Sequence, residues 1–236
     1  MIDVRPFKTL GAANHGWLDA HHHFSFAGYH DPARMGWGPL RVWNDDRIDA
    51  QTGFDPHPHR DMEIITYVRK GAITHHDHLG NEGRTRAGDV QVMSAGTGIV
   101  HAEYNREPEA TELFQIWIVP NRKGVPPRWE ARRFPEGTAD GKLEVLASGR
   151  DADLLAGALE IHQDAAILGG TLKAGTEVTH ALGNRLAYLV PTRGRLLVNG
   201  VAVNPRDGVA VKDEASLTIR ALEDAELVLA DLPQAA

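Results

Sequence analysis

The fold is decided by two stretches, GFDPHPHRDMEIITYVRKG at residues 53–71 and GDVQVMSAGTGIVHAEYN at residues 88–105. Each contains a short run of β-branched and aromatic residues bounded by glycine, which is the pattern of a β-strand between turns. Similar runs recur along the chain and predict strands at residues 40–43, 62–69, 90–93, 113–119, 186–191, 195–198 and 227–231. Helical periodicity is scarce, and its best case is the Ala-rich stretch 151–159. The chain is therefore predicted to be all-β.

Two stretches of the chain resemble each other when their glycines are aligned. The interval from Gly53 to Gly71 is 18 residues, and the interval from Gly175 to Gly194 is 19 residues. Each interval is followed by a turn dipeptide, Gly-Asn at residues 80–81 in the first case and Asn-Gly at 199–200 in the second. Such dipeptides favour tight hairpins. We infer two related β-barrel or jelly-roll-like domains.

The division between these domains is expected where the strand pattern breaks. Pro126-Pro127 and Glu136-Gly137 interrupt it, so a linker is predicted between Pro120 and Leu143. The expected domains are residues 1–130 and residues 131–236.

Composition excludes several classes of protein. The chain has 236 residues, of which 42% are apolar and 24% charged, so it can bury a core. It has no cysteine, which excludes disulfides, thiolate metal sites and a thiol nucleophile. The net charge of −7 argues against direct binding of nucleic acid, although basic residues gather at Arg122, Lys123, Arg128, Arg132 and Arg133. No apolar run is long enough for a membrane helix, and we expect a cytoplasmic protein.

The histidines are unevenly distributed. Eleven of the 13 lie in the first 101 residues. Side chains at positions i and i+2 of an extended chain point to the same face, so His57 and His59 can reach one ion, and so can His101 and Glu103. Three imidazoles and one carboxylate suit a divalent transition metal: iron is the first expectation, with copper, nickel, manganese, cobalt or zinc as alternatives.

Other histidines and one glutamate have simpler interpretations. The run at residues 21–23 and the group His75, His76 and His78 are predicted to be structural or loop residues. Glu63 lies at an even offset from His59 and would share its face if one strand ran through both, but it could equally hydrogen-bond to a histidine N–H. Its role is left open.

At this point the residues resemble a known superfamily. The two cupin signature motifs are similar to a set of residues comprising Gly53, His57, His59, Glu63, Gly71, Gly88, Gly96, His101 and Asn105. Ser94 stands where the second motif usually has proline, and His101 comes two residues later than usual. Those departures are shared by the pirin family, which the strings HGWLDA, LRVWNDD and HPHRDMEIITYV also resemble, most closely its bacterial quercetin 2,3-dioxygenase members.

The resemblance implies a bicupin that holds metal only in its N-terminal domain, through residues matching His57, His59, His101 and Glu103. It implies a dioxygenase that opens the heterocycle of a flavonol and releases carbon monoxide. The expected partners are a small planar aromatic substrate and dioxygen. Glu103 is the candidate catalytic base as well as a ligand, and Phe24, Phe26 and Trp43 could line an aromatic cavity.

Two other functions stay open. Some pirin-like proteins are regarded as co-regulators, which implies a non-enzymatic protein that senses redox state through its metal and binds a protein partner. A sugar-phosphate isomerase of the cupin type would need a cluster of basic residues near the site, and residues 40–105 show only scattered arginines. We rank the isomerase last.

Overall fold

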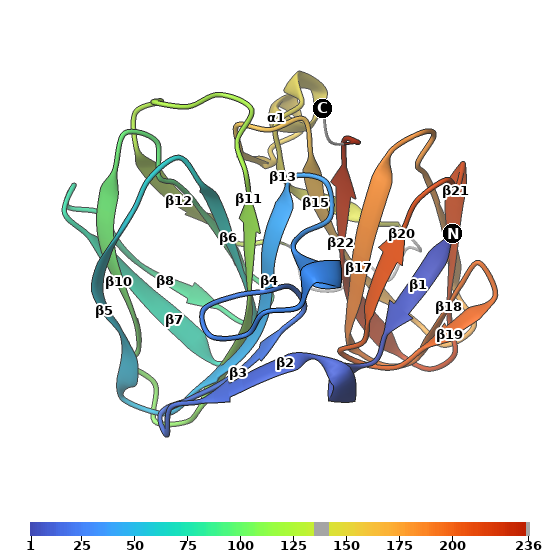
Figure 1. The fold of residues 1–236 in the computed structure, drawn as a ribbon, viewed down its shortest axis with the longest axis horizontal. Helices are drawn as coiled ribbons and strands as arrows, with labels where there is room; N and C mark the ends of the chain where they lie inside the picture. Colours follow the sequence, from blue (N-terminus) through green and yellow to red (C-terminus); the bar gives the residue numbers. More distant parts are fainter. Residues whose placement is uncertain (135–141, 235–236) are drawn as a thin grey trace.

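The computed structural model describes residues 1–134 and 142–234. Within this part of the chain the strands form four sheets, two in each half, in which nearly all neighbouring strands are antiparallel. Each half closes into a flattened barrel (Figure 1). The only α-helix in these residues is the short α1 (Asp151–Leu155), and 3₁₀ turns occur at Phe7–Thr9 and Pro32–Arg34. The prediction of an all-β chain is confirmed.

The first barrel consists of a seven-stranded and a four-stranded sheet. In spatial order the larger sheet contains β12 (Arg128–Arg132), β9 (Val90–Ser94), β6 (Glu63–Lys70), β11 (Thr111–Ile118), β4 (Leu40–Ile48), β3 (Leu18–His22) and β2 (Gly11–Asn14). The smaller sheet contains β5 (Thr52–His59), β10 (Ile99–Asn105), β7 (Ala72–Asp77) and β8 (Glu82–Arg86).

The second barrel repeats this plan. Its larger sheet contains β1 (Ile2–Arg5), β20 (Gly208–Val211), β17 (Leu186–Arg193), β22 (Ala225–Leu232), β15 (Ala166–Leu172), β13 (Glu144–Ser148) and β14 (Leu159–Glu160). Its smaller sheet contains β16 (Glu177–Ala181), β21 (Ser216–Ala221), β18 (Leu196–Val198) and β19 (Val201–Val203). The order β9-β6-β11-β4 corresponds to β20-β17-β22-β15, which confirms the internal repeat.

Corresponding glycines turn the chain at corresponding places. Gly71 follows β6 with φ +76°, and Gly194 follows β17 with φ +73°. A Cβ on Gly71 would lie 2.6 Å from Oγ1 of Thr111, and one on Gly194 would lie 2.5 Å from the carbonyl oxygen of Asp224. Both positions therefore need glycine for backbone conformation and for space.

The connection between the barrels contains more structure than its proline and glycine content indicates. β12 lies inside the predicted linker and pairs with β9, so residues 128–132 complete the first sheet. β1 joins the second barrel by pairing with β20. β1 thus lies in the expected first domain but pairs in the second barrel, whereas β12 extends beyond residue 130 and pairs in the first barrel. The division at residue 130 remains a proposal. Glu136 and Gly137 lie outside the described residues.

The other expected elements differ only in detail. The helix predicted from Asp151 ends at Leu155, because Gly157 adopts φ +101° and Leu159 already belongs to β14. All seven predicted strand segments lie within or overlap observed strands. No helix among the described residues has the length and apolarity to cross a membrane.

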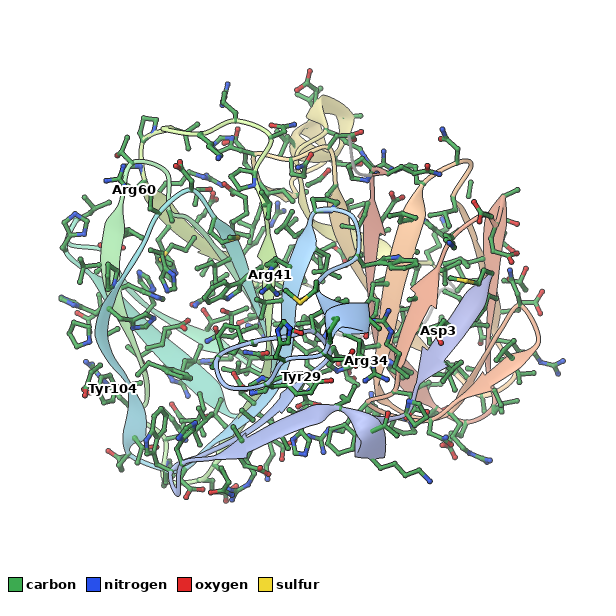
Figure 2. The ribbon with its side chains drawn as sticks, in the orientation of Figure 1. Asp3, Tyr29, Arg34, Arg41, Arg60 and Tyr104 are labelled. Atoms are coloured by element: carbon green, nitrogen blue, oxygen red, sulfur yellow. The ribbon has the colours of Figure 1, made fainter. Side chains whose placement is uncertain are left out.

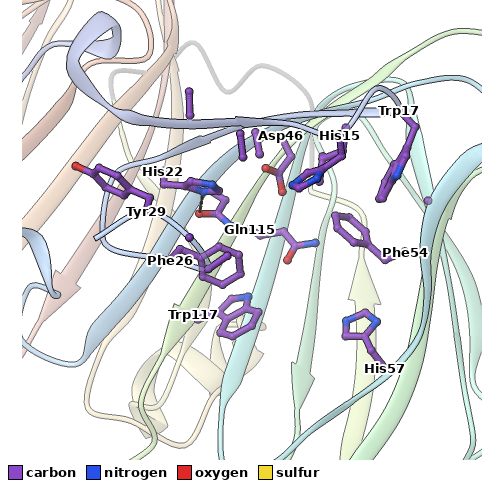
Figure 3. Close-up of a pocket in the computed structure, with 18 of the residues that line it drawn as sticks. His15, Trp17, His22, Phe26, Tyr29, Asp46, Phe54, His57, Gln115 and Trp117 are labelled. Atoms are coloured by element: carbon purple, nitrogen blue, oxygen red, sulfur yellow. Dashed lines mark hydrogen bonds between the residues drawn. The ribbon is translucent and has the colours of Figure 1, made fainter. Parts of the chain in front are cut away.

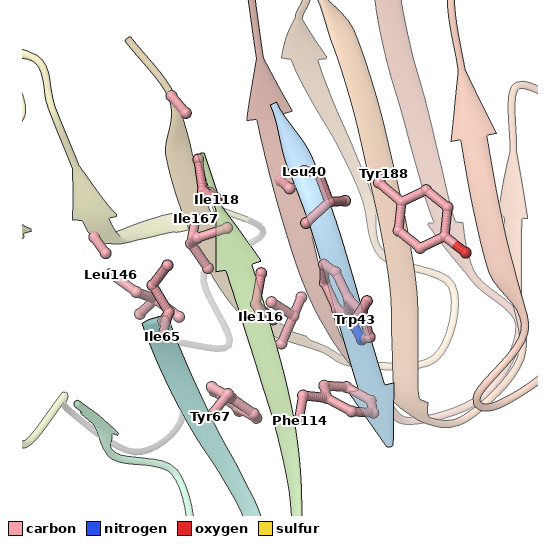
Figure 4. Close-up of a cluster of buried hydrophobic side chains, with 14 of the residues drawn as sticks. Leu40, Trp43, Ile65, Tyr67, Phe114, Ile116, Ile118, Leu146, Ile167 and Tyr188 are labelled. Atoms are coloured by element: carbon pink, nitrogen blue, oxygen red, sulfur yellow. The ribbon is translucent and has the colours of Figure 1, made fainter. Parts of the chain in front are cut away.

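The barrels meet through the outer faces of their larger sheets (Figure 4). Trp43, Phe114 and Ile116 from the first barrel pack in one buried cluster with Ile167 and Tyr188 from the second. Phe24 joins the same cluster. Phe24 and Trp43 are therefore core residues of the interface, and neither is among the residues that line the cavity described below. The segment from His23 to Pro39, which connects β3 to β4, carries Tyr29 and Arg34 across the front of this junction (Figure 2).

A buried carboxylate ties together the second barrel. Asp231 on β22 accepts hydrogen bonds from Nε2 of His180 on β16 at 2.9 Å and from the Arg185 guanidinium, and it pairs with Arg150 at 2.9 Å. Burial opposes the ionisation of Asp231, but these hydrogen bonds and charges outweigh it and lower its pKa to about 2. His180, at the place that corresponds to His57 and His59, thus has a structural partner.

This carboxylate predicts an acid limb of stability. The unfolded chain binds a proton at Asp231 below a pKa of 3.8, whereas the folded protein does so only near 2. The stabilisation is therefore complete above about pH 4 and is lost as the pH falls towards 2. We expect Asp231→Asn to lower the free energy of unfolding by about 2 kcal/mol at pH 7 and to flatten its decline between pH 4 and 2. Urea unfolding across this range measures both effects, and parallel curves for the two proteins would show the prediction to be wrong.

Candidate metal centre and cavity

The pairing of β5 with β10 brings the predicted ligands together. His57 lies directly opposite His101, and His59 lies opposite Ile99, on the next same-face position of each strand. One ligand nitrogen from each of His57, His59 and His101 lies within 4.8 Å of the others. The ring centroids of His57 and His101 are 4.5 Å apart. The structure therefore places three of the four predicted ligand side chains around one point.

The hydrogen bond of His57 leaves its outer nitrogen available. Nδ1 of His57 lies 2.7 Å from the carbonyl oxygen of Asp55, to which it can only donate. The proton is then fixed on Nδ1, and Nε2 keeps its lone pair for a metal ion.

A second chain of hydrogen bonds acts on His101 in the same way. Nε2 of His75 lies 2.9 Å from Oδ2 of Asp77, and Nδ1 of His75 lies 3.4 Å from Nδ1 of His101. Burial opposes the ionisation of Asp77, but bonds from His75 and Asn81 lower its pKa, so it is an acceptor. His75 must then donate from Nε2 and accept at Nδ1, which leaves the lone pair of His101 on Nε2.

The Nε2 atom of His101 is buried and has no hydrogen-bond partner among the described residues. Burial, followed by the neighbouring His57 and His59, lowers the pKa of His101 to about 2. Burial and His57 lower the pKa of His59 to about 4. These imidazoles are neutral at physiological pH, which is the form that binds metal. An orphaned nitrogen of His101 close to ligand nitrogens of two further imidazoles fits a divalent transition metal.

Glu103 is buried next to this group but bonds in another direction. Its carboxylate accepts hydrogen bonds from Nε2 of Gln91 at 2.5 Å and from Nε2 of Gln115 at 2.9 Å. It forms a second possible metal-binding group with His101 and His75, again within 4.8 Å. Burial raises the pKa of Glu103 to about 7. His101 is common to both groups, and the place of Glu103 as the fourth ligand remains a proposal.

Glu63 lies in a different sheet from His59. The chain bends at Asp61, with φ +46°, and Glu63 begins a strand of the larger sheet, whereas His59 ends a strand of the smaller one. Its carboxylate accepts a 2.7 Å hydrogen bond from Ser94 Oγ. The assumption of one continuous strand, on which the face shared with His59 depended, does not hold.

A cavity of about 780 Å³ opens onto the histidines (Figure 3). Its walls carry aromatic side chains from several elements, including Trp17, Phe26, Tyr29, Phe54 and Trp117, together with His57 and His59. Phe26 contacts Trp117 edge to face with centroids 5.4 Å apart, and Trp117 contacts His59 in the same way at 5.0 Å. An apolar chamber of this size that ends at a polar cluster is typical of a small-molecule site. Phe26 is the one predicted aromatic residue found in its wall.

Comparison with known proteins agrees with this arrangement. The sequence matches the pirin family over residues 3–118 and the quercetinase C-terminal cupin domain over residues 145–232. The chain belongs to the pirin family. A pirin-like protein of Caulobacter vibrioides is 64% identical over 98% of this chain and 99% of its own length. A quercetin 2,3-dioxygenase of Escherichia coli K12 is 45% identical over 99% of both chains.

Solved structures of a bacterial pirin have the same fold. The crystal structure of YhhW from Escherichia coli superposes with a TM-score of 0.93 at 43% identity, covering 99% of this chain and 98% of that one. A second structure is YhhW in complex with nickel(II), with a TM-score of 0.90 at 42% identity, covering 99% of this chain and 100% of that one. Both barrels of this pirin are thus cupin domains, and at the level of the family the chain is a dioxygenase-like oxidoreductase.

Sequence analysis did not predict the contacts that His22 and His75 make at the site. His22 is buried in the cavity wall, where its Nδ1 lies 2.9 Å from Oδ1 of Asn44. His75 is completely buried and stacks on Trp129 of β12, with centroids 4.7 Å apart and planes at 7°. Gly83 makes room for this indole, since a Cβ there would lie 2.1 Å from it. The signal for His75 is its alternation with Asp77, which puts both on one face of β7.

We predict that His101→Ala removes the metal from this pirin. The variant loses the nitrogen shared by both groups, so its affinity should fall by more than the ~10- to 100-fold caused by loss of a ligand's hydrogen-bonding partner. Metal content per chain after dialysis measures this. His76→Ala is the matched control because His76 is exposed on the opposite face of β7. Equal metal content in both variants would contradict the assignment.

A separate prediction concerns His75. His75→Phe keeps the stack on Trp129 but removes the hydrogen bond that orients His101. Metal affinity should fall by about 10- to 100-fold while the fold is preserved. Competition with a chelator measures the affinity, and thermal unfolding monitors the fold. An unchanged affinity would mean that His75 does not orient the ligand.

Proposed function

We propose that this pirin is a metal-dependent dioxygenase that opens the heterocycle of a flavonol, consuming dioxygen and releasing carbon monoxide. The observation that carries the proposal is that the aromatic-walled cavity reaches His57 and His59. The activity named for the Escherichia coli relative supports the choice of substrate. The proposed substrate is a planar polyphenol of the quercetin type.

The side chains that would hold the metal are His57, His59, His101 and Glu103. A bound divalent transition ion, with iron as the first candidate, would act as a Lewis acid on the hydroxyl and carbonyl oxygens of the substrate and assist its reaction with dioxygen. The nickel(II) complex of YhhW is consistent with a site that accepts several ions.

The protein positions the substrate through its aromatic walls. Phe26 and Trp117 form one edge-to-face pair in the wall, and Trp17 and Phe54 form another with centroids 5.1 Å apart. A flat polyphenol between such walls loses water from both of its faces, and its orientation is restricted to one plane. Its oxygen-bearing edge can then face His57 and His59.

Glu103 is the proposed proton acceptor for the substrate hydroxyl. Burial raises the pKa of Glu103 to about 7 in the metal-free protein, and a carboxylate that binds a metal through one oxygen can accept a proton on the other. Glu103 is not among the residues of the cavity wall, whereas Gln115, which donates to it, is. The proposal therefore requires the substrate hydroxyl to reach Glu103 next to His101, beyond the cavity wall. Gln91 and Gln115 hold the carboxylate in place through their hydrogen bonds.

The second barrel supports the first and, in the part of the chain that the structure describes, holds no comparable group of metal ligands. Both groups of potential metal ligands found among the described residues lie in the first barrel. In the second, His180 is held by Asp231. The chemistry is accordingly proposed for the N-terminal barrel alone.

The proposal predicts flavonol cleavage that depends on Glu103. Protein loaded in turn with iron, copper or nickel should bleach the absorbance of quercetin with an equal uptake of oxygen. Glu103→Gln keeps the shape of the side chain but removes the basic carboxylate, so turnover should fall by about 100-fold or more. The matched control is Glu82→Gln, because Glu82 is exposed on the same smaller sheet. Absence of turnover with every metal would reject the dioxygenase and favour a binding role.

A further inference from the structure

One acidic residue of the cavity wall has no role in the site described above. Asp46 lies on β4, where alternate residues face opposite sides of the sheet. Asn44 and Asp46 line the cavity, whereas Trp43 faces the second barrel. Figure 3 shows Asp46 and His57 on different sides of the cavity, with Gln115 between them in this view. Their strands belong to the two opposed sheets of the first barrel.

Asp46 is buried without the bonds that a buried carboxyl group needs. Only 2% of its surface is exposed, and its Oδ1 has no hydrogen-bond partner among the described residues. A buried polar group left in this state costs about 1–3 kcal/mol, so its presence in the cavity wall calls for an explanation. Its polar neighbours His22 and Asn44 bond to each other, with Nδ1 of His22 2.9 Å from Oδ1 of Asn44.

The charges around Asp46 do not neutralise it. Its neighbour Asp45 takes both nearby guanidinium groups, pairing with Arg69 and with Arg206 at 2.6 Å. Burial raises the pKa of Asp46 well above its usual value, with Asp45 and Glu103 adding to the effect. Arg69 opposes this shift, and Asp19 of β3 reinforces it. This shift favours the neutral carboxyl group, which can both donate and accept a hydrogen bond.

We propose that Asp46 is a specificity-determining residue that binds a hydroxyl group of the substrate at the side of the cavity opposite His57 and His59. The inference rests on the proposed function, which orients one oxygen-bearing edge of a flavonol towards the histidines. A further hydroxyl on the remote ring would then meet Asp46. That hydroxyl would supply a partner for the carboxyl group of Asp46, which lines the cavity.

This arrangement selects for a hydroxylated remote ring. A site built to hydrogen-bond a hydroxyl group discriminates against an analogue without it, because the buried polar group is again left unpaired. A ligand that carries only the hydroxyl directed at the histidines should gain nothing from Asp46. The selectivity between two such ligands therefore isolates the contribution of this residue.

The test compares quercetin, which has hydroxyl groups on both ends, with 3-hydroxyflavone, which has only the hydroxyl next to the carbonyl group. Dissociation constants are measured without oxygen by quenching of tryptophan fluorescence, since Trp17 and Trp117 line the cavity. In Asp46→Leu the affinity for quercetin should fall by about 10- to 100-fold, and that for 3-hydroxyflavone by less than about twofold. Asp46→Asn, which can still donate and accept, should stay closer to the parent.

The matched control is Asp49→Asn, which changes a solvent-facing carboxylate shortly after the same strand. Thermal unfolding separates binding from structure, because removal of an unpaired buried carboxyl should leave the melting temperature unchanged or higher. Unchanged selectivity in Asp46→Leu would overturn the inference while leaving the proposed function intact. Equal losses for both ligands with a lower melting temperature would overturn it in favour of a structural role. If the parent protein bound neither ligand, the proposed function itself would fail.

Discussion

The antiparallel register of β5 against β10 is the constraint on which the site depends. It sets His57 opposite His101, and the i, i+2 spacing adds His59 on the same face. His57 donates a hydrogen bond to the carbonyl oxygen of Asp55, and His101 donates one to His75, which in turn donates to Asp77. These bonds fix which nitrogen carries the proton in His57 and in His101. A shift of this register by one residue would turn these side chains to the outside of the barrel.

The larger sheet of the first barrel serves the interface and the cavity with opposite faces of the same strands. On β11, Phe114 and Ile116 pack against the second barrel, while Gln115 and Trp117 face the cavity. The second barrel thus gives the sheet a rigid apolar backing. Among the described residues, the potential metal-binding groups all lie in the first barrel, so the second barrel contributes this packing and not a metal site. Its histidine at the matching place, His180, instead stabilises the barrel through Asp231.

Much of this could be predicted from the sequence, because strand alternation is local. It placed His57 with His59 and His101 with Glu103, and the glycine spacing indicated the repeat. Alternation also separates His75 from His76, but only the tertiary structure shows that His75 meets His101 and Trp129. The pairing of β1 with the second barrel, and of β12 with β9 in the first, depends on long-range contacts that no local pattern encodes. Nothing in the sequence distinguishes Asp46 from a solvent-exposed acidic residue, and only the structure shows that it is buried.

The central claim is that a single metal ion binds between β5 and β10. Anomalous X-ray diffraction at the absorption edge of the bound metal, on crystals of the loaded protein, tests this most directly. The account predicts one peak, about 2.0–2.2 Å from a nitrogen of each of His57, His59 and His101 and from a carboxylate oxygen of Glu103. A peak held only by His75, His101 and Glu103, or a peak outside the first barrel, would contradict it.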